Sequence, residues 1–581
     1  MEDRIDLNNA ELQQALQIIQ FTSRSLFLTG KAGTGKSTFL RYIASHTNKK
    51  HIILAPTGIA AINAGGSTLH SFFKLPFHPL LPNDSQYSIR NIRKTLKYNG
   101  EKIKIIRELE LIIIDEISMV RADIIDFIDK VLRVYSHNMR EPFGGKQLLL
   151  VGDIYQLEPV VKEEDKALLR PFYKSSFFFD AHVFQQMQLV SIELKKVYRQ
   201  SDPVFIGILD HIRTSQVTSQ DLQLLNQQVG NTEELPSAKH ELSITLSTRR
   251  DTVDYINTQK LNELDGEPEV YQGIIDGEFP TNSLPTPQEL KLKLGAQVLF
   301  VKNDKDHRGV NGTLGTVTGF DEDTHDRIAI VTEDGKEYIV EREIWSNVRY
   351  TFNEQEKKIE EEELGTYTQF PIRLAWAITV HKSQGLTFNH VKIDFTGGVF
   401  AGGQTYVALS RCTSLKGITL KDPIVRSEVF VKPEVVQFAQ QNYNNTGIIS
   451  NALKQSKADK QYWDAVQAFD QGDMQAALDN FFLAIHSRYV IERPVPRRYI
   501  RRKLNIINKQ KKEIEDLKSK LKEKDDFLKK LAVEYVVMAK ECEHERMRDA
   551  AIRNYEKALA LCPDYPEAKR RLVKLKSPKK K

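Results

Sequence analysis

Short apolar runs alternate with longer amphipathic stretches along the first 200 residues of the chain. The apolar runs fall at residues 25–29, 52–55, 111–114 and 148–151. Strands that are apolar on both faces and separated by helices are typical of a parallel sheet with helices on each side. We therefore predict an α/β domain over residues 1–200 with one such sheet at its centre.

The pattern changes in the second half of the chain. Residues 290–350 contain short strands separated by turns rich in Gly, Asp and Asn, which indicates a small β-barrel or meander. An acid-rich stretch at 354–363 is expected to be a loop, and α/β character then returns. The predicted parts are a second α/β domain (201–289 and 365–430), an inserted barrel (290–364), a linker (431–460) and an all-helical tail (461–575).

Residues 30–37 read GKAGTGKS, a match to the phosphate-binding loop GxxxxGK[ST] between a predicted strand and a predicted helix. Glycines let backbone N–H groups close around phosphate oxygens, and the helix N-terminus adds partial positive charge. The lysine of such a loop reaches the β- and γ-phosphates, and the serine hydroxyl ligates Mg²⁺. The predicted nucleotide-binding residues are Gly30, Gly33, Thr34, Gly35, Lys36, Ser37 and Thr38.

Two further apolar runs lead into polar residues suited to hydrolysis. Asp115 and Glu116 end one run; we expect Asp115 to hold Mg²⁺ and Glu116 to orient and polarise the attacking water. Gln156 follows another run, and its amide can bond the γ-phosphate or the lytic water. The alternative for the two acids is a solvated strand end. Glu116 and the lack of a guanine-reading Asn-Lys-x-Asp motif argue against a switch GTPase.

Charge and composition restrict how the protein could bind nucleic acid and in which compartment it would act. The 581 residues carry a net charge of +6, yet residues 501–530 and 569–581 together hold 20 Lys/Arg and only 6 Asp/Glu. The remainder is acidic overall, so nucleic acid would have to bind in a local groove. No apolar run approaches the roughly 20 residues that span a bilayer, and the three cysteines lack metal-ligand spacing. We expect a cytoplasmic protein with reduced thiols and no membrane segment.

Several blocks, in this order, resemble the Pif1 (Pif-one) DNA helicases, which are RecD-like members of helicase superfamily one. They include residues 30–37, APTGIAAINAGGSTLHSFF at 55–73, IDEISM at 114–119 and FPIRLAWAITVHKSQGLT at 370–387. The resemblance covers about residues 5–430. It implies an α/β fold of two RecA-like P-loop domains with parallel sheets, a small β-barrel inserted in the second, and ATP bound between them.

The resemblance also implies further residues of the nucleotide site. Arg199 and Arg411 would reach across the cleft from the second domain, where an arginine stabilises charge in the transition state. Gln384 and Gly385 would belong to the same surface, and Gln13, placed by spacing, would read the adenine edge. Taken alone, the arginines would be surface charges and Gln13 a solvated helix residue. The catalytic set is then Lys36, Asp115, Glu116, Gln156, Arg199 and Arg411.

Single-stranded DNA would follow a groove over both domains, held by small polar groups and local cations, with aromatic rings stacked on bases. The contacts that the resemblance implies are Thr57, Gly58, Thr68, His70 and Phe72 in the first domain and Thr379, His381 and Lys382 in the second. The alternatives are buried structural histidines for His70 and His381 and a core position for Phe72. The segment 74–90 would carry a wedge that parts the duplex, or is a surface loop.

The tail contains two segments, 472–485 and 551–563, that each resemble half of a tetratricopeptide repeat. Between them apolar residues recur every seven positions, at Ile507, Ile514, Leu521 and Leu528. This spacing suggests a short coiled-coil stripe, which could pair with a second chain or pack on the tail's own helices. The tail could bind a protein partner, grip duplex DNA or only cap the rest of the molecule.

These features favour an ATP-dependent DNA helicase that, by the resemblance, moves 5′ to 3′ on single-stranded DNA and unwinds duplexes at single-strand/double-strand junctions. ATP and Mg²⁺ are the expected cofactors. We expect a monomeric, bacterial, nucleoid-associated motor of DNA repair, recombination or replication. Two alternatives remain: a DNA-stimulated ATPase that remodels without separating strands, and a helicase-derived scaffold that acts through its tail.

Overall fold

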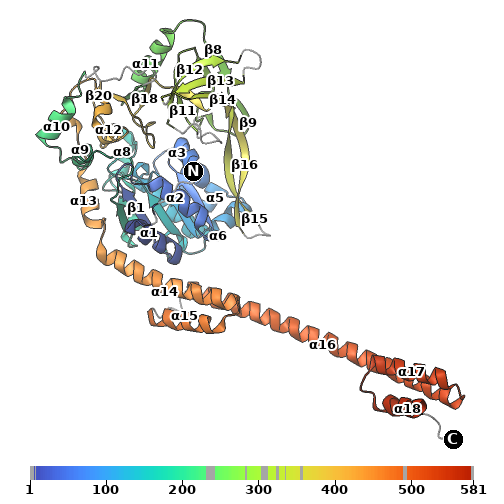
Figure 1. Cartoon of the computed structure of the whole chain (residues 1–581). Helices are drawn as coiled ribbons and strands as arrows, with labels where there is room; N and C mark the ends of the chain where they lie inside the picture. The colour runs from blue at the N-terminus through green and yellow to red at the C-terminus, as the bar shows by residue number, and fades with distance from the viewer. Residues whose placement is uncertain are drawn as a thin grey trace. The chain divides into compact units, whose positions relative to one another are not determined.

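A computed structural model of the chain divides into two compact units, residues 1–460 and residues 461–581. Figure 1 shows the elements of both units. The structure describes all residues except 1–5, 7, 77, 231–241, 282–283, 303–311, 322–325, 334, 354–357, 488–493 and 578–581. None of the helices within the described residues is both long enough and apolar enough to cross a membrane.

The first sheet of the 1–460 unit has six parallel strands in the order β3-β2-β4-β5-β1-β6. The four predicted strands are its β1, β2, β4 and β5. They read as continuous apolar runs because β1, β4 and β5 are buried along their whole length. The strand bounds are β1 (Leu26–Gly30), β2 (His51–Ala55), β3 (Ser67–Thr68), β4 (Leu111–Ile114), β5 (Gln147–Val151) and β6 (Val190–Leu194).

Alternate residues of this sheet belong to two separate hydrophobic clusters. Ile112 and Ile114 of β4 pack in a cluster with residues of α7, whereas Leu111 and Ile113 pack in a cluster with residues of α1 and α2. The sheet is therefore covered on both faces, as predicted. The helices of this domain are α1 (Ala10–Phe21), α2 (Lys36–His46), α3 (Gly58–Ala64), α4 (Leu69–Phe73), α5 (Ile92–Leu96), α6 (Gly100–Glu108), α7 (Ala122–Tyr135) and α8 (Glu163–Leu169).

A second parallel sheet, in the order β18-β7-β19-β20, forms the core of the second α/β domain. Leu246, Ile378 and Ile393 from three of its strands pack in one cluster with residues of α9 and α12. Its strands are β7 (Ile244–Ser247), β18 (Ala377–Thr379), β19 (Val391–Asp394) and β20 (Ile418–Leu420). Its helices are α9 (Pro203–Arg213), α10 (Ser219–Asn226), α11 (Arg250–Asn262) and α12 (Gln404–Leu409).

The segment between α11 and β18 folds into antiparallel sheets. A five-stranded sheet has the order β14-β13-β12-β11-β17, and a three-stranded sheet has the order β15-β16-β9. The antiparallel part begins at Glu269, earlier than the predicted residue 290. Its strands are β8 (Glu269–Gln272), β9 (Ile274–Gly277), β10 (Glu289–Leu292), β11 (Gln297–Phe300), β12 (Leu314–Phe320), β13 (Arg327–Thr332), β14 (Glu337–Glu341), β15 (Glu343–Asn353), β16 (Lys358–Gln369) and β17 (Ile372–Leu374).

The acid-rich stretch 354–363 was expected to be a loop, but from Lys358 onward it is part of strand β16. β16 pairs with β15 over eleven residue pairs, so the two strands form a long hairpin. The hairpin reaches the first domain, where the Ser67 hydroxyl donates to the Val348 carbonyl oxygen over 3.2 Å. In Figure 1 this hairpin runs from the antiparallel sheets to α5 and α6.

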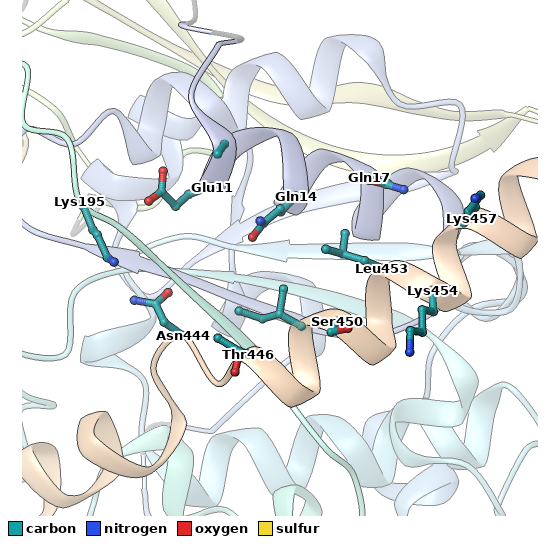
Figure 2. Close-up of a pocket in the computed structure, with 12 residues that line it drawn as sticks. Glu11, Gln14, Gln17, Lys195, Asn444, Thr446, Ser450, Leu453, Lys454 and Lys457 are labelled. Carbon is teal, nitrogen blue, oxygen red and sulfur yellow. The ribbon is translucent and has the colours of Figure 1, made fainter.

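The predicted linker 431–460 is instead part of the core of the first unit. It forms α13 (Pro433–Asn442) and the start of α14 (Thr446–Asp470), and Val435 and Ala452 are buried in the two clusters that cover the first sheet. Between these helices, the Tyr443 hydroxyl lies 3.2 Å from that of Thr29. Figure 2 shows α14 running beside α1, with a groove between them.

The second unit is helical, as predicted for the tail. Its small core is built from alanines around Tyr555, including Ala551 and Ala558 of the second repeat-like segment. By contrast, Ile514 and Leu521 of the heptad stripe are exposed, so the described helices of the tail do not cover them. The assignment as a tetratricopeptide-like repeat stays a prediction. The remaining helices are α15 (Met474–Ser487), α16 (Pro494–His544), α17 (Arg548–Leu561) and α18 (Pro566–Lys576).

Candidate functional site

The predicted phosphate-binding loop runs from the end of β1 to the start of α2. Gly33 and Gly35 adopt φ angles of 79° and 83°, which disfavour residues with a Cβ atom. A Cβ at Gly33 would also collide with the Cβ of Arg199. The loop therefore requires glycine for its conformation and for the close approach of the segment that follows β6.

Lys36, the first residue of α2, points back into the loop. Its Nζ donates to the carbonyl oxygens of Gly30 and Lys31 over 2.6 and 2.9 Å. Burial lowers its pKa to about 8, and the carboxylates of Asp153 and Glu116 oppose this shift. The lysine is thus held at the loop, close to both acids, where phosphate oxygens would replace its carbonyl partners.

Asp115 and Glu116 follow β4, as the sequence predicted. Glu116 has a φ angle of 49°, a strained conformation for a non-glycine residue. Its backbone N–H donates to Oδ1 of Asp115 over 2.9 Å. Burial and the neighbouring Asp115 carboxylate together raise the pKa of Glu116 to about 7. Burial also raises the pKa of Asp115. Two desolvated carboxylates therefore meet beside Lys36.

Gln156 lies in the loop after β5 and is buried. Its Nε2 is 3.4 Å from Oδ2 of Asp153. The same aspartate accepts hydrogen bonds from the buried guanidinium of Arg213, with Nη2 to Oδ1 at 3.0 Å. Burial opposes the charge on Arg213, yet the Asp153 carboxylate holds its pKa well above its usual value. The glutamine loop is thus tied to α9 by a buried ion pair.

Arg199 was expected to reach into the cleft from the second domain, but its backbone lies on the phosphate-binding loop. The preceding Tyr198 donates its N–H to the Gly33 carbonyl oxygen over 2.8 Å. The Arg199 guanidinium points the other way, toward the second domain. Its Nη1 donates to the Ser410 carbonyl oxygen over 3.3 Å, and its Nη2 lies 3.5 Å from the Gly385 carbonyl oxygen. Arg199 therefore bridges the two walls of the cleft, and burial lowers its pKa.

Arg411 follows α12 and is only 2% exposed. Its guanidinium donates to the Val407 oxygen over 2.9 Å and to the Ser410 hydroxyl over 2.9 Å. Burial and the charge of Arg199 lower its pKa to about 9, while Glu116 acts in the opposite sense. Arg411 lies within electrostatic range of Glu116, as a cross-cleft position requires, but its present hydrogen bonds are to its own domain.

The two domains are joined by contacts that the sequence did not predict. The Tyr406 hydroxyl accepts the Ala32 N–H over 2.9 Å, and Lys31 forms an ion pair with Asp210 of α9. A Cβ at Gly403, the residue before α12, would collide with the carbonyl oxygen of Gln156. One end of α12 thus touches the glutamine loop, and the other end leads to Arg411. None of these residues carries a local signal, because each partner is distant in sequence.

The other nucleotide candidates are placed less tightly. Thr34 is buried and its hydroxyl donates to the Lys31 oxygen over 2.9 Å, whereas Ser37 is exposed and Thr38 half-buried at the start of α2. Gln13 is exposed on α1, so its contact with adenine stays a prediction. Its neighbour Gln14 lines the groove between α1 and α14 in Figure 2.

The first-domain DNA candidates follow strands of the first sheet. The Thr57 hydroxyl caps α3 by accepting the Ala60 N–H over 3.3 Å, so Gly58 begins that helix. The Thr68 hydroxyl caps α4 by accepting the Ser71 N–H over 3.1 Å. His70 is half-buried, and burial lowers its pKa, which favours the neutral ring. Thr57 and Gly58 are accessible at the end of β2, as a backbone contact requires.

Phe72 is not available as a stacking surface. It is 3% exposed and packs in the core, with Lys102 Nζ 3.1 Å above its ring. Leu69, Phe72 and Phe73 lie at helical spacing on the inner face of α4, which explains the burial. The predicted wedge segment is also anchored, since Leu80 and Tyr87 are buried in the same cluster. A role for that segment in strand separation stays a prediction.

The second-domain candidates follow β18. Thr379 Oγ1 accepts the Lys382 N–H over 3.3 Å, and burial lowers the pKa of His381. Gln384 was predicted at the nucleotide, but its side chain lines a different cleft, together with Lys382, Arg373 and α3 of the first domain. Gly385, in contrast, lies at the nucleotide cleft, where its oxygen faces Arg199.

Comparison with known proteins identifies relatives of this chain. A profile of PIF1-like helicases matches residues 8–222, and one of the 2B domain of DNA helicase Pif1 matches residues 280–320. The ATP-dependent DNA helicase Pif1 of Bdellovibrio bacteriovorus is 32% identical over 439 residues, which cover 74% of this chain and 91% of that protein. Other curated relatives are longer, and the chain spans about half to three fifths of them, with 46% of a trypanosomal and 60% of the human relative.

Solved structures agree with this relationship. The Pif1 of a Bacteroides species in complex with ADP-AlF4 is 40% identical, with a TM-score of 0.68, and the match covers 76% of this chain and 97% of that one. The Bacteroides Pif1 bound to single-stranded DNA has the same identity and coverage, with a TM-score of 0.54. The chain therefore belongs to the PIF1-like helicase family.

Proposed function

We propose that the protein is an ATP-dependent DNA helicase. The observation that carries this proposal is the cleft between the two RecA-like domains, where Glu116 lies within electrostatic range of Lys36 in its own domain and of Arg411 in the other. ATP bound in such a cleft would draw the domains together, and hydrolysis would release them. Several relatives carry the name ATP-dependent DNA helicase, which supports the proposal.

Each side chain of the cleft has a distinct task in this proposal. Lys36 binds the β- and γ-phosphates, and Glu116, when ionised, accepts a proton from the attacking water. Gln156 contacts the γ-phosphate or the water, and its loop passes the loss of phosphate to α12 through Gly403. Arg411 and Arg199 stabilise negative charge as the bond to the γ-phosphate breaks.

The residues present also fit a magnesium ion. Ser37 offers an exposed hydroxyl at the start of α2, and Asp115 offers a desolvated carboxylate at the end of β4. Mg²⁺ prefers such oxygen ligands together with phosphate oxygens and water. When bound with ATP, the ion would neutralise charge on the β- and γ-phosphates.

DNA would pass along the α3 side of the first domain and the loop after β18 in the second. The long β15–β16 hairpin contacts the first domain at Ser67, beside the candidate Thr68. A relative in the same family has been solved with single-stranded DNA, which supports this class of substrate. Two strand-holding surfaces on domains that open and close would permit stepping along one strand, in the 5′ to 3′ direction that the family resemblance implies.

Strand displacement on matched 5′-tailed and 3′-tailed duplexes tests the proposal. We expect ATP-dependent release of the labelled strand from the 5′-tailed substrate, and no release by Glu116→Gln. Release from the 3′-tailed substrate alone would contradict the direction. DNA-stimulated ATP hydrolysis with no release from either substrate would contradict the helicase and favour a remodelling ATPase.

We propose a docking role for the tail, in a cytoplasmic protein that acts on DNA in repair, recombination or replication. Deletion of residues 471–581 tests this role and keeps the part of α14 that packs on α1. Normal unwinding with loss of cellular function would support docking. Loss of unwinding itself would show that the tail belongs to the motor.

A further inference from the structure

A second cleft separates the two RecA-like domains, away from the phosphate-binding loop. Its first wall is α3 of the first domain, with Ile59, Ile62 and Asn63. Its second wall carries Arg373 of β17, together with Lys382 and Gln384 from the loop after β18. Lys36, Arg199 and Arg411 are not among its lining residues, so it is distinct from the nucleotide cleft.

Arg373 occupies an unusual position in this cleft. Its Nε is buried and has no hydrogen-bond partner, and within the described part of the chain its guanidinium forms no ion pair. Burial lowers its pKa to about 10, and no acidic group opposes the shift. Buried arginines are normally paired, because a desolvated charge without a partner is costly. Arg373 as a whole is half-buried, and no described residue supplies its partner, so an anionic ligand would complete its hydrogen bonding.

Two neighbouring side chains add further donors. Nε2 of Gln384 is also buried and lacks an acceptor among the described residues. Lys382 is exposed; desolvation and the positive charges of Arg373 and Arg250 lower its pKa, while Asp254 acts in the opposite sense. No acidic side chain is among the described residues that line the cleft. Arg373, Lys382 and Gln384 therefore bring hydrogen-bond donors to a cleft whose described lining holds no carboxylate.

The backbone fixes where Arg373 points. In the antiparallel pairing of β17 with β11, Arg373 lies directly opposite Leu299, which lines the same cleft. Facing them, α3 begins after Thr57 and Gly58, the candidate backbone contacts at the end of β2. The guanidinium thus emerges from the five-stranded sheet next to the second domain, toward the helix that follows a candidate DNA contact of the first.

An anion with several oxygens and an apolar neighbour would complete this site. A phosphodiester presents two oxygens that a guanidinium can bind in a fork, and the attached sugar could pack on the Ile59 and Ile62 side chains. We propose that Arg373, with Lys382 and Gln384, binds one phosphodiester of single-stranded DNA between the two domains. This inference rests on the proposed DNA helicase function and adds a contact that sequence reasoning missed.

Binding at this site would depend on whether the two domains are open or closed. One wall belongs to each domain, so a phosphate held by Arg373 is also held close to α3 only when the cleft between the domains is narrow. A strand would then be gripped at this point in the closed state and released as the domains part. Arg373 would serve as a positioning contact on the DNA rather than as a residue of the ATP chemistry.

The test compares Arg373→Gln with wild type, using the full-length protein and fluorescein-labelled oligo(dT) in anisotropy titrations over a salt series. We expect the affinity to fall on the order of 10- to 100-fold. The slope of log K against log salt should become shallower by about 0.7, the value for one contact to a single strand. Arg373→Lys should keep the slope and recover part of the affinity, because lysine keeps the charge without the fork.

The matched control is Arg327→Gln, which removes an exposed arginine of the same five-stranded sheet that pairs with Glu341. DNA-free ATP hydrolysis and the salt dependence of oligo(dT) binding should both be unchanged in Arg327→Gln. Thermal unfolding supplies an independent readout: removing an unpaired buried charge should leave the melting temperature of Arg373→Gln unchanged or raise it. A clear decrease would mean that the guanidinium has a structural partner, and would overturn the inference.

The outcomes also separate this inference from the proposed function. Wild-type protein that binds oligo(dT), with Arg373→Gln binding equally well at every salt concentration, overturns the phosphodiester site and leaves the helicase proposal intact. Wild-type protein that neither binds oligo(dT) nor shows DNA-stimulated ATP hydrolysis overturns both.

Discussion

The two clefts of the first unit differ in whether their arginines have acceptors within the described protein. In the nucleotide cleft, Arg213 is paired with Asp153, and the guanidinium of Arg411 is surrounded by carbonyl and hydroxyl acceptors. In the second cleft, Arg373 has no acceptor among the described residues. A site whose cations have hydrogen-bond acceptors within the protein, and which is balanced in that sense, is organised before its ligand arrives, whereas a site with unmatched donors needs the ligand to supply the acceptors.

Arg411→Ala should give the largest effect and should show that the balanced cleft is both catalytic and structural. We expect ATP turnover to fall on the order of 10³-fold, because charge on the γ-phosphate loses its stabilisation. Nucleotide affinity should fall only modestly. The melting temperature should also decrease, since buried oxygens such as that of Val407 lose their donor. Steady-state ATP hydrolysis, nucleotide titration and thermal unfolding check the three parts.

A large loss of nucleotide affinity with unchanged turnover in Arg411→Ala would contradict the cross-cleft role. An unchanged melting temperature would contradict the difference from Arg373, whose removal is expected to be neutral or stabilising. Arg411→Lys is a useful companion, because it keeps a charge but cannot reproduce the planar set of donors.

Glu116→Gln should lower turnover on the order of 10²- to 10³-fold and keep ATP binding. The amide preserves shape and removes only the ability to accept a proton. Binding of a fluorescent ATP analogue and single-turnover hydrolysis separate the two effects. Glu163→Gln, which changes an exposed acid at the start of α8, is the control. Near-normal hydrolysis by Glu116→Gln would refute its assigned role.

Asp153→Asn makes the nucleotide cleft resemble the second cleft, because it removes one of the two carboxylates that pair with Arg213. Breaking a buried ion pair by removing one partner costs on the order of 3–5 kcal/mol of unfolding free energy. Glu193, whose Oε1 is 3.0 Å from Arg213 Nη1, should reduce this loss. Chemical denaturation measures it, and a change below about 1 kcal/mol would show that Glu193 alone can balance the arginine.

Tyr406→Phe should have the smallest effect, because it removes one hydroxyl from the contact between the domains. The Ala32 N–H then loses its acceptor, at a cost of about 1–3 kcal/mol for a buried donor. ATP binding stabilises the same closed arrangement, so KM for ATP should rise several-fold while kcat changes little. A fall in kcat with unchanged KM would place the hydroxyl in the chemistry instead.

The balanced cleft was largely predictable from the sequence. Gly30, Asp115 and Gln156 lie just after apolar runs, and the carboxyl ends of parallel strands meet at one edge of a sheet. A local pattern therefore determines where these residues gather. Arg213 and Tyr406 belong to the same cleft, yet each is defined by a partner distant in sequence, and an isolated arginine or tyrosine in a helix carries no such signal.

The second cleft was not predictable in the same way. Arg373 lies in a three-residue strand, and only the absence of a partner among the described residues distinguishes it from a surface arginine. The Glu-rich part of β16 was expected to be a loop, because glutamate is uncommon in strands and the pairing with β15 that forms the strand is not local. Phe72 was misplaced because aromatic residues suit both a core and a stacked base.

The segment that follows α13 has a mechanical consequence. The Tyr443 hydroxyl meets that of Thr29, the residue before the phosphate-binding loop, and Asn444 Oδ1 accepts the N–H of Glu193 on the neighbouring strand β6. The covalent path from the tail into the motor therefore ends at the root of the nucleotide site. A pulling force on the tail would first load the part of α14 that packs in one cluster with α1, and the segment before α14 then reaches β1 and β6.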